Sequence, residues 1–175
     1  FGALLTPLLS RQADKKTLMI FANFVAAVAL VGNYFSPPGF AIALIAHTTM
    51  MFCFGIMITL LFAMYTDCSE YGEWKSGKNS AGLTVSASMF SLKFGSAMGV
   101  AIPSSVLALY GFAAPVDGVD QVQTAEALGG IAMMFNIVPG LFFLVAGTLM
   151  FYYRIDRKLL AAIEMELNLR RSATQ

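Results

Sequence analysis

The chain has 175 residues, of which 58% are hydrophobic and only 12% are charged, and its mean hydropathy is +0.72. A soluble domain of this size still exposes about a third of the surface of its unfolded chain, so it has no room to bury so many apolar side chains. The composition excludes an ordinary soluble domain and indicates that lipid surrounds part of the protein. With a net charge of +1 and no basic run, we predict no nucleic-acid partner.

Four apolar runs are long enough to cross a bilayer, for which a helix needs ~20 residues. They cover residues 17–35, 40–66, 81–112 and 128–153. The first residues, 1–10, are apolar but too few to span, and they predict the end of a fifth helix. Transmembrane barrels consist of short alternating segments, unlike these unbroken runs. The predicted fold class is therefore an all-α, polytopic membrane protein with a transmembrane helical half-bundle at residues 1–153.

The beginning of the chain points to a longer protein. Phe1 is not an initiator methionine, and the apolar residues after it lack the layout of a signal peptide. We therefore expect these 175 residues to be part of a longer polypeptide.

The lysines and arginines predict an orientation. If each run crosses once, ten of the eleven basic residues lie on one side and Lys93 lies within the bilayer. The ten are Arg11, Lys15, Lys16, Lys75, Lys78, Arg154, Arg157, Lys158, Arg170 and Arg171. Because cytoplasmic segments carry the excess of basic residues, we expect this side, with the C-terminus, to be cytoplasmic. Residues 154–175 would be a tail, either an amphipathic helix on the membrane surface or a short disordered segment.

Lys93 is the candidate functional residue within the membrane. It lies 12 positions after Ala81, which is roughly 18 Å along a helix and close to mid-bilayer. A charge there is costly and tends to mark a substrate or ion pathway, although a structural ion pair is the alternative. Two residues further on, Gly95 and Gly99 form a small-residue motif that we interpret as ordinary helix packing.

A cluster of charges separates the second and third of these runs. It reads Asp67-Cys68-Ser69-Glu70-Tyr71-Gly72-Glu73-Trp74-Lys75. Its residues alone predict a solvated loop whose charges satisfy one another, with Trp74 as an anchor at head-group level.

Nothing in the chain predicts an enzyme, a catalytic residue, a metal site or a cofactor. Cys53 and Cys68 are fifteen positions apart, one in an apolar run and one in the charged segment, and no histidine supports a metal pair. We expect His47 to make a hydrogen-bonded helix contact. Asn23, Asn33 and Asn136 suit hydrogen bonds between helices, worth about 1 kcal/mol or less each.

The charged cluster resembles a motif of a known family. The string from Asp67 to Lys75 is similar to the Asp-x-x-Asp-Tyr-Gly-Glu-Trp/Phe-Lys loop of the glycoside–pentoside–hexuronide:cation symporters, the melibiose-permease-like carriers of the major facilitator superfamily. In that family the loop joins the tenth and eleventh helices, and an important lysine follows in the eleventh, where Lys93 falls. Residues 2–16 resemble the loop after the eighth helix of major facilitator proteins. Glu70 replaces the more usual aspartate and keeps the charge.

The resemblance implies the C-terminal half of a sugar:cation symporter of the bacterial inner membrane. Lys93 would then contact the substrate or couple it to the cation, which is Na⁺ or H⁺ and bound mainly by the missing N-terminal half. The expected partners are membrane lipid, a small sugar and that missing half. Alternatives are a major-facilitator transporter of a non-sugar solute, such as a lipid or drug, and a non-transporting membrane scaffold or sensor.

Overall fold

The computed structural model describes residues 2–113 and 121–172, and every regular element among them is a helix. In chain order these are α1 (Gly2–Gln12), α2 (Lys15–Phe35), α3 (Phe40–Ser76), α4 (Ala81–Leu109), α5 (Ala125–Ala132), the π-helical turn η1 (Met133–Ile137), α6 (Val138–Leu149), the 3₁₀ turn η2 (Met150–Tyr152) and α7 (Arg157–Ser172). The predicted first stub, the join between the third and fourth spans and the predicted tail each extend beyond the described residues, at Phe1, 114–120 and 173–175.

Four helical stretches in the described part of the chain are long and apolar enough to cross a membrane. They are α2, α3, α4 and the continuous run from Ala125 to Tyr152, which joins α5, η1, α6 and η2. The prediction of an all-α membrane protein with four spans after a short first helix is confirmed.

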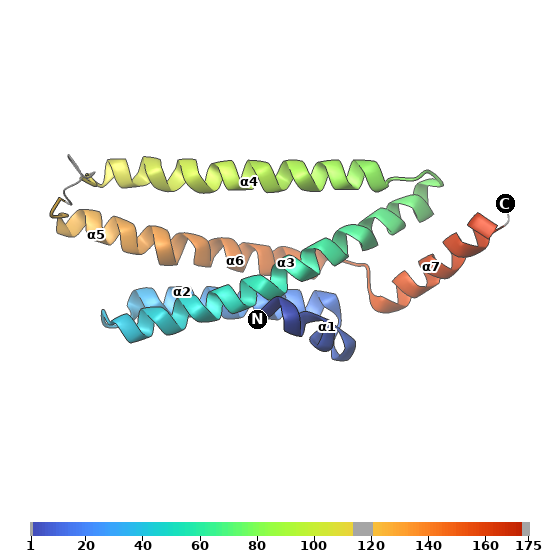
Figure 1. Ribbon diagram of the computed structural model, residues 1–175, viewed down its shortest axis with the longest axis horizontal. Coiled ribbons are helices and arrows are strands. Elements are labelled where there is room, and N and C mark those ends of the chain that lie inside the picture. The colour runs from blue at the N-terminus through green and yellow to red at the C-terminus, as the bar shows by residue number, and fades with distance from the viewer. Residues whose placement is uncertain (1, 114–120, 173–175) are drawn as a thin grey trace.

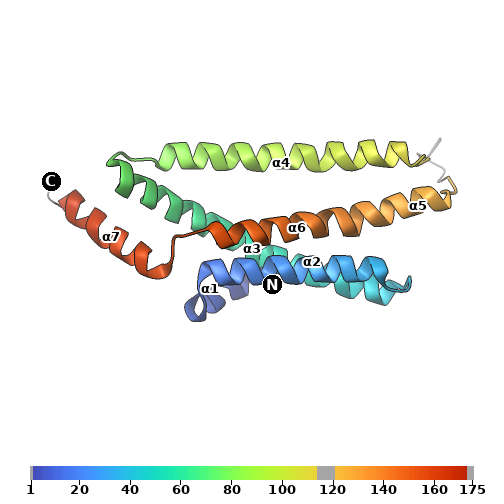
Figure 2. The same cartoon turned by 180° about the vertical axis from the view of Figure 1, so that it is seen from behind.

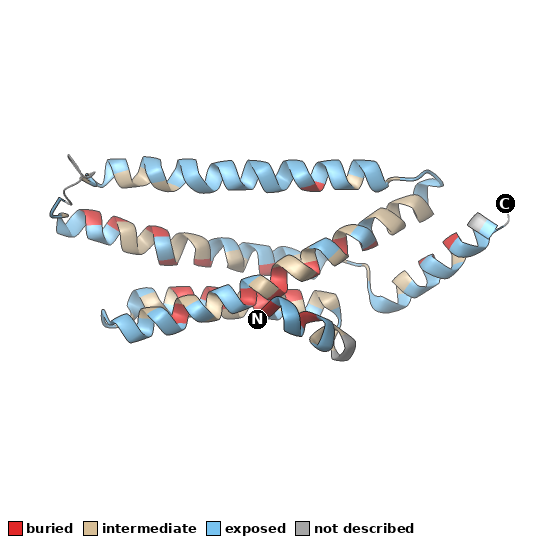
Figure 3. Ribbon diagram, in the orientation of Figure 1, coloured by how far each residue is buried: buried red, intermediate tan, exposed pale blue. Residues whose placement is uncertain are grey.

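Helix α2 is the centre of the bundle. It packs against α3 on one side and α6 on the other, and α1 lies across α3 (Figures 1 and 2). Small side chains allow this close approach, since Ala22, Ala26 and Ala27 of α2 are almost completely buried. Together with Ile56 and Leu60 of α3, they place the core where α2 and α3 cross, which is the most strongly buried part of Figure 3.

Helix α4 stands apart from this core. Figure 1 shows it running alongside the α5–α6 helices, and its main contacts are with α3 near one end and α5 near the other. Ser88 is the one buried residue among the described residues of α4, whereas the rest of the helix is partly or fully exposed (Figure 3). Pro103 lies inside the helix without ending it.

The last span contains a local change of helical pitch. The π turn η1 ends two residues before Pro139, which has no N–H to donate, so the hydrogen-bond pattern has to change there. Within this turn Asn136 is buried, and its side-chain oxygen accepts a 2.8 Å hydrogen bond from the Asn33 amide of α2. The expected interhelical bond is therefore present for this pair. Among the described residues Asn23 forms no such bond, and its side chain instead donates to Met19 O of its own helix.

The prediction of a loop at residues 67–75 is wrong, because α3 continues to Ser76. The extra ten residues add about 15 Å of helix. The segment contains no proline, and its charged and aromatic residues tolerate a helix well, so charge alone does not stop it. The helix ends at Gly77, which adopts the left-handed conformation with φ 68° and donates its N–H to Glu73 O. Asp67–Ser76 is called the α3 extension below.

The tail also forms a helix, α7, and its apolar side faces protein. Ile163 and Leu167 are almost fully buried, and the main contacts of α7 are with α3. Met165 and Leu169 remain exposed on α7. The prediction of an amphipathic helix therefore fits the described residues, and its position on a lipid surface stays a prediction.

Candidate functional site

Most of the charged residues gather at one end of the helices. The turn between α1 and α2, the α3 extension and α7 all lie at this end, on the right in Figure 1, and we call it the charged end. The order of the spans causes this arrangement, because every two successive spans bring the chain back to the same end of the bundle. Residues far apart in the sequence are thereby brought together.

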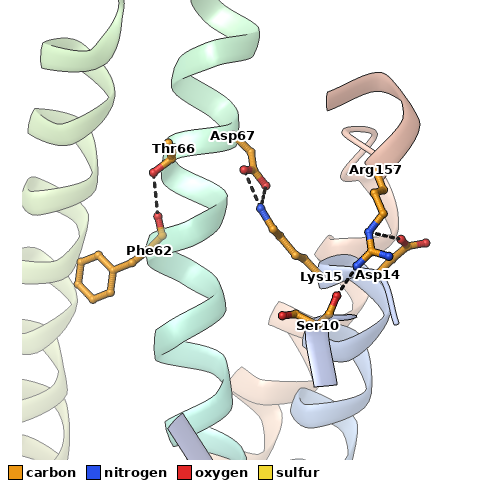
Figure 4. A network of polar contacts seen from close by, with 7 residues as sticks. All are labelled: Ser10, Asp14, Lys15, Phe62, Thr66, Asp67 and Arg157. Carbon is orange, nitrogen blue, oxygen red and sulfur yellow. Dashed lines mark hydrogen bonds and ion pairs between the residues drawn. The ribbon is translucent and has the colours of Figure 1, made fainter. Parts of the chain in front are cut away.

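The central contact of the charged end is an ion pair between α2 and α3. Lys15 Nζ lies 2.8 Å from both carboxylate oxygens of Asp67 (Figure 4). The Asp67 side chain is only 8% exposed, whereas the Lys15 side chain is 35% exposed. A buried carboxylate needs such a partner, since an uncompensated charge in this position is costly.

Further contacts tie α7 and its linker to the same place. The Arg157 guanidinium lies 3.9 Å from the Asp14 carboxylate and also donates to Ser10 O (Figure 4). On the other side, Lys16 Nζ donates to two backbone carbonyls at the end of the last span, Phe151 O at 2.9 Å and Tyr153 O at 2.7 Å. A lysine at these carbonyls satisfies acceptors that the ending helix leaves open.

These contacts surround a cavity of about 290 Å³. It is lined by Asp14, Lys15, Lys16, Thr17, Asp67, Tyr153, Arg154, Ile155, Asp156, Arg157 and Leu160. The lining carries charges of both signs, which suits exchange of ion-pair partners between segments more than selective binding of one anion or cation.

Trp74 of the α3 extension binds α7. Trp74 Nε1 donates a 2.7 Å hydrogen bond to the Glu166 carboxylate, and Arg170 lies 2.6 Å from the other carboxylate oxygen. The hydrogen bond from Trp74, followed by that from Arg170, lowers the pKa of Glu166 below its ordinary value. The sequence predicts Trp74 as an anchor at head-group level, but in the structure its ring N–H donates to a carboxylate of the same protein.

The other residues of the predicted motif occupy successive turns of the extension. The Tyr71 and Trp74 ring centroids are 5.9 Å apart, and Lys75 Nζ lies 5.9 Å from the centre of the Tyr71 ring. Glu70, Gly72 and Glu73 are half-buried. The motif therefore forms a structured helix surface that contacts α2, α4 and α7.

Lys93 lies far from the charged end, in the middle of α4, where its side chain is exposed. Within residues 2–113 and 121–172, its ammonium has no hydrogen-bond or ion-pair partner, so the structure does not bring Lys93 and the charged motif together. Whether it contacts substrate stays a prediction.

Gly95 and Gly99 follow Lys93 on α4 and line an apolar cavity of about 590 Å³ between α4 and the last span. A Cβ atom added at either glycine would meet nothing within 4 Å. No helix among the described residues uses this motif for close packing, and its packing role stays a prediction.

Sequence reasoning missed two partners, Lys15 for Asp67 and Glu166 for Trp74. The orientation predicted from the basic residues places all four of these residues on the same side of the membrane, which indicates that they could lie near one another. It did not identify the pairs, because many charges share that side. His47 was expected to make a helix contact, and its Nδ1 lies 3.0 Å from Ala43 O of the same helix.

Four apolar spans with an ion-paired charged end define a polytopic helical membrane protein. The chain belongs to the MFS/sugar transport protein family, whose family model matches residues 1–157. This confirms the relationship to the sugar carriers of the major facilitator superfamily.

Curated relatives match almost all of the chain. It is 31% identical to the "Glucuronide carrier protein homolog" of Escherichia coli (strain K12), covering 96% of this chain and 36% of that protein. It is 30% identical to the "Putative glycoside/cation symporter YagG" of the same organism, covering 99% of this chain and 37% of that protein. The "Isoprimeverose transporter" of Lactiplantibacillus pentosus is 27% identical, with 94% and 34% covered. No solved structure matches significantly. The chain thus spans about a third of the length of these relatives.

Proposed function

We propose that the chain is the C-terminal part of a secondary active transporter that carries a glycoside, pentoside or hexuronide across the cytoplasmic membrane together with a cation. The observation that carries this proposal is the match of nearly the whole chain to proteins named as sugar carriers and symporters. All of these names describe carriers, so transport rather than an enzymatic reaction is the proposed activity.

The mechanism would be alternating access, in which two halves of the carrier rock about a central site. The charged end has the features that such a motion needs, because it joins four segments by ion pairs and hydrogen bonds that can separate and form again. In the proposed orientation this end is cytoplasmic, since basic residues favour that side. Breaking and reforming these contacts would accompany opening toward the cytoplasm.

Lys93 would serve at the central site. It is the one lysine or arginine inside a predicted span, and it projects from a helix that the rest of the described chain leaves exposed. Its ammonium can donate hydrogen bonds to sugar hydroxyls or pair with a carboxylate, whether of a uronic acid or of the remainder of the protein. The coupling ion would be Na⁺ or H⁺, bound mainly by residues outside this chain.

A second candidate is a transporter of a lipid-like or drug-like solute. The cavity between α4 and the last span favours it, because Met98 and Ile102, five and nine residues beyond Lys93 on α4, give it an apolar lining together with Phe142 of α6. Sugars need more hydrogen-bonding groups than such a surface offers. The lysine and the family relationship outweigh the apolar lining in our assignment.

Uptake by the full-length protein in sealed vesicles tests both candidates. The panel should contain a glycoside, a pentose, a uronate and a lysolipid, each measured with an inward Na⁺ gradient, an inward H⁺ gradient or neither. We expect cation-dependent accumulation of one sugar class. Accumulation of the lysolipid alone would favour the second candidate, and no accumulation of any solute would favour a non-transporting role.

A further inference from the structure

The two ends of α4 are held by close contacts at glycines. At its first end, the α3 extension passes next to Ser80, the residue before α4. A Cβ added to Gly72 would lie 2.5 Å from Ser80 Oγ and 3.3 Å from Ser80 Cβ. The same hydroxyl donates a 2.9 Å hydrogen bond to Ser69 O, so moving the hydroxyl aside costs that hydrogen bond. Only a residue without a side chain fits at position 72 in this arrangement.

The far end of α4 has the same kind of contact. Tyr110 follows the last residue of α4, and its ring lies on the backbone of Gly130 in α5. A Cβ at Gly130 would lie 2.7 Å from Tyr110 Cγ and 3.1 Å from its Cδ2. Tyr110 is 40% exposed, but Cβ and Cγ, the atoms in contact, lie at the base of the side chain, and Cβ stays at 3.0 Å when the ring turns.

The glycines within α4 itself have no such role. Added Cβ atoms at Gly82, Gly95 and Gly99 would meet nothing within 4 Å. The close contacts are therefore restricted to the two ends of α4, while its middle, with Lys93, packs against little of the described chain.

We propose that Gly72 and Gly130 are positioning residues, which fix the two ends of α4 and thereby set where Lys93 lies. The expected effect on transport rests on the proposed function, whereas the position of α4 does not depend on it. This role also explains why the charged motif contains Gly72, which supplies neither a charge nor an aromatic ring.

The expected displacement is large enough to measure. Ordinary van der Waals contact begins near 3.4 Å, so alanine at position 72 has to displace the Ser80 hydroxyl by about 1 Å, at the expense of its hydrogen bond to Ser69 O. Lys93 lies thirteen residues beyond Ser80, or roughly 20 Å along the helix, and a tilt at one end grows along that length. A misplacement of about 1 Å costs up to roughly 100-fold at an enzyme's reacting centre, so a transport loss on the order of tenfold is reasonable.

Spin labels at Ile45 on α3 and Val100 on α4 measure the positioning in the full-length protein with its native cysteines replaced. Both side chains are well exposed. We expect Gly72→Ala to shift or broaden the distance distribution between the labels, and Gly82→Ala, the matched control, to leave it unchanged. Adding Ser80→Ala to Gly72→Ala should restore most of the original distribution, because it removes the hydroxyl that clashes. Gly130→Ala with and without Tyr110→Ala tests the other end in the same way.

The label distances and the transport rates together separate the possible outcomes. We expect Gly72→Ala to lower uptake about tenfold with normal protein in the membrane, and Ser80→Ala to rescue it. If Gly72→Ala does not accumulate but the double variant does, the clash is equally supported. Unchanged distances in both glycine variants, or equal effects of Gly82→Ala, would overturn the positioning role. Shifted distances in a protein that transports no sugar would keep the positioning and remove the proposed function instead.

Discussion

Lys15 holds the Asp67 carboxylate through two 2.8 Å hydrogen bonds across 52 residues of sequence. The pair joins the first turn of α2 to the point where α3 continues into its charged extension. The two partners differ in environment, since Asp67 is nearly buried and Lys15 still reaches solvent. Because of this difference, removing Lys15 and removing Asp67 should lower the stability of the protein by different amounts.

Removing the lysine should therefore cost more than removing the carboxylate. Lys15→Met leaves a buried carboxylate without its partner, which costs about 1–3 kcal/mol. Asp67→Asn leaves a lysine that can turn to solvent, and its cost should be smaller. Lys15→Arg keeps a bidentate donor and should keep most of the stability. Lys78→Met, a change at an exposed lysine in the α3–α4 turn, serves as the control and should stay within about 0.5 kcal/mol.

Denaturant-induced unfolding of the purified protein in detergent measures these differences. An Asp67→Asn variant that is less stable than Lys15→Met would contradict the assignment of Asp67 as the buried partner.

The number and type of the spans could be predicted from the sequence, because a bilayer imposes a minimum length on every apolar helix. The end of α3 could not. Charges at Asp67, Glu70 and Glu73 predict the start of a loop, yet a helix can leave the membrane and continue in water, and the left-handed Gly77 is what ends it. The partners of the charged residues depend on side-chain distances that orientation alone does not determine. The exposed position of Lys93 follows from the packing of α4, which no pattern within α4 reveals.

Contact between α7 and the α3 extension should weaken in acid. The hydrogen bonds from Trp74 and Arg170 lower the pKa of Glu166, so the folded state prefers the ionised carboxylate. A lowered pKa gives a contribution that is fully present above the ordinary glutamate value of about 4.3 and is lost as the pH falls through the folded value. We expect the Trp74 indole N–H signal in NMR spectra to keep its hydrogen-bonded position at neutral pH and to change only below that range.

The variants at this contact have a matched control. Glu166→Gln should remove the acid-dependent change of the Trp74 signal, while Glu164→Gln, two residues away and exposed, should leave it intact. Trp74→Phe identifies the signal and should raise the pKa of Glu166 toward its ordinary value. A Trp74 signal that titrates identically in wild type and Glu166→Gln would exclude this contact as the cause.

The proposed orientation places the charged end in the cytoplasm. Gly39 lies in the turn between α2 and α3, at the opposite end from Ser76 of the α3 extension, and both residues are exposed. Cysteine at Gly39 should react from outside intact cells with a membrane-impermeant reagent, and cysteine at Ser76 should react only after the cells are opened. Labelling of the Ser76 variant from outside would reverse the orientation.

Lys93 provides the test of transport itself. In the full-length carrier, Lys93→Ala should abolish concentrative uptake and leave the amount of protein in the membrane nearly normal, because removing a charge from mid-bilayer saves about 3 kcal/mol on insertion scales. If Lys93 were half of a structural ion pair with another part of the carrier, its loss would strand an acidic group and reduce the amount of folded protein.

Lys93→Arg distinguishes these two roles further. The planar guanidinium still neutralises a carboxylate but does not replace a compact ammonium at a shaped sugar site. We expect Lys93→Arg to fold normally and to lose most of its uptake, with Leu83→Met, at an exposed position of the same helix, as a control that keeps both. Uptake, membrane protein level and thermal stability should be measured together for each variant. Full uptake by both Lys93 variants would remove this residue from the transport mechanism, and full activity of Lys93→Arg alone would indicate that only its charge is needed.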